Sequence, residues 1–223
     1  MNVTVLQFPG TNCEYDTKYA FEKLGANVTI LWHKESQIPS NTDLIVIPGG
    51  FSYGDYLRSG AIARFANVMN SVSEFAKNGG KVLGICNGFQ ILLEAGLLPG
   101  AMKRNNTLHF ISKYNHLKVI NNNNTFLKEL NNNDVVNIPV AHHDGNYFID
   151  ENGLKELEAN EQILLKYCDE NGNIKSLNGS VAQIAGICNK EKNVFGLMPH
   201  PERAIEMLLG CDDGVKMLQG FFK

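Results

Sequence analysis

Cys86 stands in the stretch of this sequence whose residue types and spacing best suit nucleophilic chemistry. Glycines lie two positions before it and two positions after it, at Gly84 and Gly88. A short aliphatic run ends at Ile85, and an apolar, helix-like segment begins at Phe89. Small residues on both sides of a nucleophile are what a sharp strand-to-helix turn requires, because a side chain there would crowd the bend. We therefore expect Cys86 in solvent reach at a helix N-terminus, where backbone N–H groups favour a thiolate.

A thiol nucleophile needs a base, and His200 is the best candidate in the sequence. It stands between two prolines in the run Met198-Pro-His-Pro-Glu202. Residues i and i+2 of an extended segment face the same side, and Pro201 disfavours helical geometry at the residue before it. Glu202 can then accept the second ring N–H of His200 while the imidazole takes a proton from Cys86. The pattern predicts a Cys-His-Glu triad that attacks a carbonyl carbon.

Attack on a carbonyl produces an oxyanion, which needs two hydrogen-bond donors. We expect backbone N–H groups in this role, with Asn87 directly after the nucleophile and Gly50 at the end of a neighbouring predicted strand. Each signal has an ordinary alternative when it is taken alone. A cysteine after a strand is more often a small buried hydrophobe, a lone His-Pro is more often a loop histidine, and Pro-Gly-Gly usually just marks a turn. The combination of these signals favours catalysis.

The run His142-His143-Asp144 could suggest a metal site. Adjacent residues of a strand point to opposite faces and rarely bind one ion together, so a structural or substrate-proximal loop is favoured. We expect no metal and no other cofactor in this chain. The sequence also has no G-x-x-x-x-G-K-[ST] phosphate loop, so we expect that the chain alone does not bind ATP.

The composition is that of an ordinary globular protein. Of 223 residues, 43% are hydrophobic and 19% are charged, and the net charge of −3 gives no electrostatic case for nucleic acid or an anionic membrane. No apolar run approaches the roughly 20 residues that span a bilayer. The five cysteines are scattered, odd in number and without a C-x-x-C pair, which argues against a disulfide framework or a zinc site. Together with the absence of a secretory signal, this predicts a cytoplasmic protein.

Strand-like and helix-like segments alternate in the first half of the chain. We expect strands over 3–8, 27–32, 43–47 and 82–85, and helices over 17–24, 61–77 and 89–95. Such alternation predicts a parallel sheet covered by helices on both faces, with its chemistry at the carboxyl ends of the strands.

The second half of the chain has a different pattern. Residues 104–134 are rich in asparagine and weakly patterned, and the runs 121–124 and 131–133 indicate surface turns rather than domain linkers. Short strands are expected over 135–140, 162–167, 181–188 and 194–197, and a helix over 202–209. No internal repeat is present. We therefore predict one α/β domain over 1–223, with a central mostly parallel sheet and a short antiparallel extension in the second half.

The spacing Gly84-x-Cys86-x-Gly88-x-Gln90, taken with His200-Pro-Glu202, resembles the class I glutamine amidotransferases. Longer blocks across essentially the whole chain are similar to the glutaminase subunits of phosphoribosylformylglycinamidine synthases. These blocks are 48–63, 86–90, 96–100, 184–187 and 196–204. The resemblance implies that Cys86, His200 and Glu202 are catalytic, that Gly50 and Asn87 are the oxyanion donors, and that Gln90 helps hold glutamine.

The resemblance also implies a reaction and partners. The thiol would attack the γ-carboxamide of glutamine, release ammonia, and leave a thioester that water hydrolyses to glutamate. Ammonia would pass to a large synthetase subunit that uses ATP and Mg²⁺ to amidate formylglycinamide ribonucleotide in purine synthesis, with a small subunit that often bridges the two. Two alternatives remain: a glutaminase subunit of another pathway, and a regulatory module that keeps the fold without the chemistry.

Two loops depart from the pattern that the family would lead us to expect. Ala-His-Gly-Glu-Gly is replaced by Ala141-His-His-Asp-Gly145, and Asn-Pro-Asn-Gly-Ser is replaced by Ser176-Leu-Asn-Gly-Ser180. Neither loop contains a triad residue. We expect them to affect the edge of the site or a surface that faces a partner.

Overall fold

A nine-stranded sheet forms the centre of the computed structural model, which describes residues 1–222. The strand order is β2-β1-β3-β4-β11-β10-β9-β6-β7. The strands of this sheet are β1 (Asn2–Gln7), β2 (Asn27–Trp32), β3 (Leu44–Ile47), β4 (Lys81–Ile85), β6 (Ile111–Val119), β7 (Val135–His142), β9 (Ile163–Cys168), β10 (Ile184–Cys188) and β11 (Val194–Leu197). A separate antiparallel pair joins β5 (Ala101–Lys103) to β8 (Asn146–Phe148).

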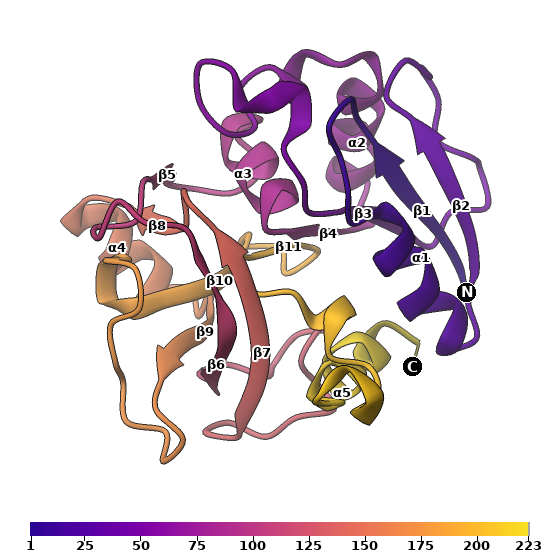
Figure 1. Ribbon diagram of the computed structural model, residues 1–223. Coiled ribbons are helices and arrows are strands. Elements are labelled where there is room, and N and C mark those ends of the chain that lie inside the picture. Colours follow the sequence, from indigo (N-terminus) through magenta and orange to yellow (C-terminus); the bar gives the residue numbers. More distant parts are fainter. Residues whose placement is uncertain (223) are drawn as a thin grey trace.

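Helices cover both faces of the parallel half of the sheet, from β2 to β11 (Figure 1). The helices are α1 (Glu14–Lys23), α2 (Asn67–Lys77), α3 (Asn87–Glu94), α4 (Glu151–Ala159) and α5 (Asp213–Gln219). In Figure 1, α2 and α3 lie above β3 and β4 as drawn, and α1 lies below the sheet. All four residues of β3 are buried, as expected for a parallel strand with helices on both sides.

Antiparallel strands continue the same sheet beyond β11. They are β10, β9, β6 and β7, and all come from the second half of the chain. The predicted class, α/β with a helix-covered parallel sheet and an antiparallel extension, is therefore confirmed.

The turns predicted at 121–124 and 131–133 lie outside every helix and strand, but β6, a nine-residue strand between β9 and β7, was not predicted. Only two of its residues, Leu117 and Val119, are buried. Its other positions are mostly polar, so the hydrophobic alternation that identifies a strand is missing from its sequence. Helices α4 and α5 were not predicted either.

Two expected helices are broken in the structure. The segment 61–77 contains a 3₁₀ turn at Ala63–Phe65 and then α2, because Ala66 between them is extended, with φ −64° and ψ 145°. The segment 202–209 contains two separate 3₁₀ turns, at Pro201–Arg203 and Met207–Leu209. Glu202 therefore lies in the first short turn after β11 and not in a regular helix.

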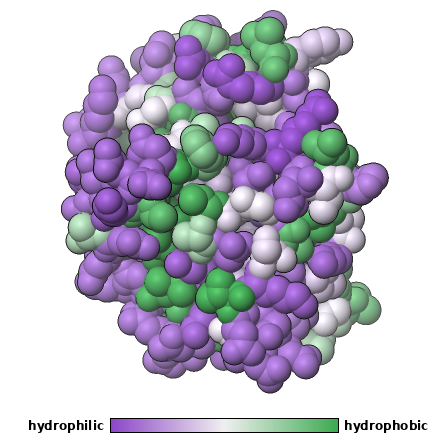
Figure 2. Space-filling view, turned by 90° about the vertical axis from the view of Figure 1, so that its left-hand side faces the viewer, coloured by the Kyte–Doolittle hydropathy of each residue, from purple (hydrophilic) through white to green (hydrophobic). Residues whose placement is uncertain are grey.

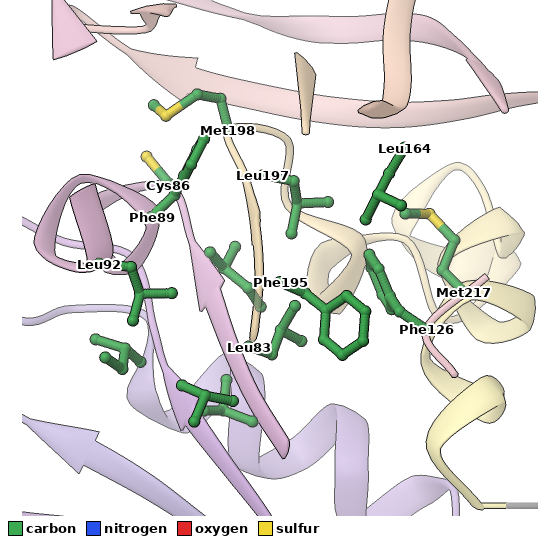
Figure 3. Close-up of a cluster of buried hydrophobic side chains, with 14 of the residues drawn as sticks. Leu83, Cys86, Phe89, Leu92, Phe126, Leu164, Phe195, Leu197, Met198 and Met217 are labelled. Atoms are coloured by element: carbon green, nitrogen blue, oxygen red, sulfur yellow. The ribbon is translucent and has the colours of Figure 1, made fainter. Parts of the chain in front are cut away.

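A hydrophobic cluster holds β4 and β11 side by side below the cysteine (Figure 3). Leu83 of β4 pairs in register with Phe195 of β11, and both side chains are fully buried. Figure 3 shows Phe89 and Leu92 of α3 approaching this cluster from the side of Cys86. Because parallel neighbours end at the same edge of the sheet, the segments that follow β4 and β11 are brought together there.

The surface over α4 and β9 is mostly hydrophilic, with hydrophobic residues in small groups between polar ones (Figure 2). Among residues 1–222, no helix combines the length and the apolar character needed to cross a bilayer.

Candidate active site

Cys86 sits on a strained turn between β4 and α3. Its backbone has φ 52° and ψ −105°, a conformation that a residue with a Cβ rarely adopts. A Cβ at Gly88 would lie 1.8 Å from the carbonyl oxygen of Ile47, and a Cβ at Gly84 would lie 2.7 Å from that of Gly88. Both flanking glycines are thus required by close packing, as the sequence predicts.

The thiol of Cys86 lies at the wall of a cavity of about 460 Å³. Its side chain is only 5% exposed, and Sγ lies 3.6 Å from the carbonyl oxygen of Ala141 at the end of β7. The turn therefore presents the sulfur to this cavity, with little of the residue exposed.

His200 and Glu202 form a buried ion pair at the same edge of the sheet. Nδ1 of His200 lies 2.6 Å from Oε1 of Glu202, and each residue is 2% exposed. Burial opposes the charged imidazolium, but the charges of Glu202 and Cys86 outweigh it and hold the pKa of His200 well above its ordinary value. Nε2 of His200 is buried and makes no hydrogen bond.

Gly49 shows how closely the groups of this site approach one another. A Cβ built on Gly49 would lie 2.7 Å from Cε1 of His200 and 3.5 Å from Cβ of Cys86. The structure thus brings together the cysteine, the histidine and the carboxylate that were chosen from the sequence.

Cys13, at the start of α1, is a second thiol beside the imidazole that sequence reasoning missed. The same Cβ on Gly49 would lie 3.0 Å from Sγ of Cys13, and burial raises the pKa of this thiol. Ligand atoms of Cys13, His200 and Glu202 lie within 4.8 Å of one another, the spacing of a metal site. However, Nη2 of Arg203 lies 3.1 Å from Sγ of Cys13, and this fixed positive charge disfavours a cation there.

The backbone N–H groups of Gly50 and Asn87 are both available as donors. Gly50 has φ +148°, and a Cβ there would lie 2.7 Å from Cα of Thr11, so only glycine fits without a shift. Within residues 1–222 the Gly50 N–H donates no backbone hydrogen bond. Asn87 is the first residue of α3, where an N–H has no acceptor within the helix.

The side chains of Asn87 and Gln90 tie three walls of the cavity together. Oδ1 of Asn87 accepts a hydrogen bond from the Ser52 N–H at 3.0 Å, and its Nδ2 donates to Oε1 of Gln90 at 2.9 Å. Nε2 of Gln90 donates to the carbonyl oxygen of Asp144 at 2.6 Å. Gln90 also lines the cavity, so it is placed to shape the space that a ligand would enter.

Proteins of known sequence are similar to this chain over its whole length. The profile of the CobB/CobQ-like glutamine amidotransferase domain matches residues 1–210. The chain is 70% identical, over all of both chains, to phosphoribosylformylglycinamidine synthase subunit PurQ of Sulfurimonas denitrificans. It is 61% identical to subunit PurQ of Wolinella succinogenes, over 99% of each chain. The chain belongs to this glutamine amidotransferase family.

Solved structures agree with this assignment. A chain in the structure of PurLQS from Thermotoga maritima is 39% identical to this amidotransferase, with a TM-score of 0.89 and coverage of 99% of this chain and 97% of that one. A glutamine amidotransferase from Thermotoga maritima, at 16% identity and a TM-score of 0.61, covers 92% of this chain and 77% of that one. This second likeness concerns the fold alone.

The two loops that depart from the family pattern pack against each other in this amidotransferase. Nδ2 of Asn178 donates to the carbonyl oxygen of Gly145 at 2.6 Å, and Oγ of Ser180 lies 3.2 Å from the same oxygen. A Cβ on Gly145 would lie 2.3 Å from Nδ1 of His142, so this glycine allows the imidazole to fit.

His142 is held as a neutral imidazole with a defined tautomer. Nδ2 of Asn105 donates to two carbonyl oxygens, and Oδ1 of Asn105 accepts from the Gly145 N–H, so Oδ1 also accepts from Nδ1 of His142 at 3.1 Å. The proton is therefore on Nδ1, and the buried Nε2 is an acceptor without a donor. Burial, aided by the charge of His200, lowers the pKa of His142 to about 4.

The run His142-His143-Asp144 lines the cavity, as expected for a substrate-proximal loop. In the described part of the chain, the cluster with metal-ligand spacing comprises Cys13, His200 and Glu202 and includes none of these three residues.

We expect Glu202→Gln to lower the pKa of His200, because the variant removes the charge that raises it. The pKa of His200 is higher in the folded protein than the value of 6.5 in the unfolded chain, so the charged ring stabilises the fold below pH 6.5. That stabilisation is lost as the pH rises through the pKa of the folded state. Titration of the ring by NMR would measure the change. The kcat for glutamine hydrolysis should fall by at least about 100-fold. An unchanged ring pKa would refute the role of Glu202.

Proposed function

We propose that this chain is the glutaminase subunit of a phosphoribosylformylglycinamidine synthase. It hydrolyses glutamine to glutamate and ammonia, and the ammonia is used to convert formylglycinamide ribonucleotide to formylglycinamidine ribonucleotide in purine synthesis. The observation that carries the proposal is the meeting of Cys86, which lines the cavity, with the His200–Glu202 pair behind it. It occurs in a chain that is 70% identical throughout to a PurQ subunit.

In this mechanism Cys86 is the nucleophile. The imidazole of His200 takes the thiol proton, and Sγ attacks the γ-carbonyl carbon of glutamine. His200 then gives the proton to the departing nitrogen, which leaves as ammonia, and a glutamyl thioester remains on Cys86. A water molecule, deprotonated by His200, attacks the thioester and releases glutamate. Glu202 holds the imidazole in the required tautomer and stabilises its charged form throughout.

Gly50 and Asn87 supply the two backbone donors for the oxyanion that forms in each attack. Within residues 1–222 these N–H groups have no acceptor, which supports this assignment, because a preorganised donor need not break another bond. Gln90 positions glutamine by fixing the loop that ends at Asp144.

The partners of this subunit are a large synthetase subunit and a small bridging subunit in the cytoplasm. The large subunit uses ATP and Mg²⁺, and this chain holds no cofactor. The Thermotoga maritima structure named PurLQS contains a chain of the same fold, which supports such an assembly. Exposed apolar side chains at the cavity also fit a covered surface: Leu57 is 90% exposed and Phe51 is 46% exposed, and both line the cavity.

Reconstitution tests this function. We expect the isolated chain to hydrolyse glutamine only weakly, because a freely running site would waste glutamine. Addition of the large and small synthetase subunits with ATP, Mg²⁺ and formylglycinamide ribonucleotide should produce glutamine-dependent synthesis. Activation by the synthetase of a different pathway instead would identify another amidotransferase. No glutamine use with any synthetase would indicate a regulatory module.

A further inference from the structure

The cavity beside Cys86 contains a pair of carboxylates that the triad chemistry does not use. Asp55, in the 3₁₀ turn after β3, and Asp144, in the loop after β7, both line it. The hydroxyl of Ser59 donates to Oδ2 of Asp144 at 3.0 Å and also lies within hydrogen-bond reach of Asp55. A hydroxyl has one proton, so Ser59 cannot donate to both carboxylates at once.

Two further acceptors at this cavity accept no hydrogen bond from residues 1–222. Oδ1 of Asp144 is buried, and Nδ1 of His143, at 3.3 Å, forms no hydrogen bond with it. Nε2 of His142, on a side chain that is 3% exposed, is also buried without a partner and carries no proton. Buried acceptors without donors are costly, so the site is suited to a ligand that brings several N–H groups.

The charges around the carboxylate pair point to a cationic group. Burial, and then the charge of Asp144, raises the pKa of Asp55 to about 6, so the folded chain does not fully compensate this negative charge. Arg58 is engaged elsewhere, since its Nη2 lies 2.7 Å from Oε2 of Glu94. Arg104, at the rim, has its Nε 3.8 Å from Oδ1 of Asp144, beyond hydrogen-bond distance.

We infer that Asp55 and Asp144 bind the α-ammonium group of glutamine and so select an α-amino acid amide over other primary amides. This inference rests on the proposed glutaminase function. An ammonium group brings three N–H donors and one positive charge, which matches the unfilled acceptors and the uncompensated carboxylate. The carboxamide at the other end of glutamine reaches Cys86, and Arg104 remains available for the α-carboxylate.

The test compares glutamine with its desamino analogue, glutaramate, which keeps the carboxamide and carboxylate but lacks the ammonium. For the unaltered protein in the reconstituted complex, kcat/KM should be about 10- to 100-fold higher for glutamine, the value of about one charged hydrogen bond. In Asp55→Asn, and separately in Asp144→Asn, this ratio should fall to within about threefold of unity, through a higher KM for glutamine. Thermal unfolding would confirm that each variant is folded.

The control is Glu74→Gln, which neutralises an exposed carboxylate on α2 that does not line the cavity and should keep the full ratio. The inference is overturned if Asp55→Asn and Asp144→Asn both keep the full kcat/KM ratio of glutamine to glutaramate. Equal kcat/KM values for the two amides in the unaltered protein would also overturn it. Neither result would affect the proposed function. That proposal fails if the unaltered complex releases no glutamate from glutamine, or if only the synthetase of a different pathway activates the chain.

Discussion

Replacing Cys86 by alanine is expected to abolish glutamine hydrolysis, with kcat lower by at least about 10⁴-fold. Without the sulfur no thioester can form, and neither His200 nor the two backbone donors can replace that covalent step. Ammonia-dependent synthesis by the complete complex should be retained, because it bypasses this site. Both activities can be measured on one preparation, with glutamine and then an ammonium salt as the nitrogen source.

The matched control is Cys211→Ala, because Cys211 is another largely buried thiol but does not line the cavity. It should retain glutamine-dependent activity. Release of glutamate by the Cys86 variant at the normal rate would show that the assigned nucleophile is wrong. Loss of ammonia-dependent synthesis as well would mean that the substitution disturbs the complex.

The second large effect is expected from Gly88→Ala. The added Cβ would lie 1.8 Å from the carbonyl oxygen of Ile47, which is backbone and cannot rotate away as a side chain could. Either α3 must move away from β3 or the strained turn at Cys86 must relax, and each change displaces the thiol. We expect a loss of about 3 kcal/mol in the free energy of unfolding, measured in urea, together with a loss of glutaminase activity.

Gly96→Ala separates this steric effect from the backbone effect of losing a glycine. Gly96 has φ +69°, and a Cβ there would meet no atom within 4 Å. Its substitution should cost about 1 kcal/mol and leave activity intact. If the two variants lose equal stability and the Gly88 variant remains active, close packing at Gly88 does not shape the elbow.

The candidate site around Cys86, His200 and Glu202 could be predicted from the sequence because its signals are local. The glycines around Cys86 are set by contacts between adjacent elements, and the short spacing of His200 and Glu202 allows them to form an ion pair directly. The strands that carry these segments, β4 and β11, are buried aliphatic runs, which periodicity identifies well.

The rest of the site depends on contacts between distant segments. Cys13 lies beside His200 only because the end of β1 and the end of β11 meet at one edge of the sheet. Asp55 and Asp144 are 89 positions apart, and no local pattern marks them as a pair. β6 was missed for a different reason, since its mostly polar residues conceal a strand that is held by pairing on both sides.

The most direct test of the central claim is to locate the covalent adduct of a glutamine-mimicking diazoketone by mass spectrometry. The account predicts one adduct, on Cys86, whose formation excess glutamine slows and Glu202→Gln impairs. Cys13 lies at the same imidazole but does not line the cavity, so it should remain unmodified. An adduct on Cys13 or another cysteine with Cys86 unmodified would contradict the account.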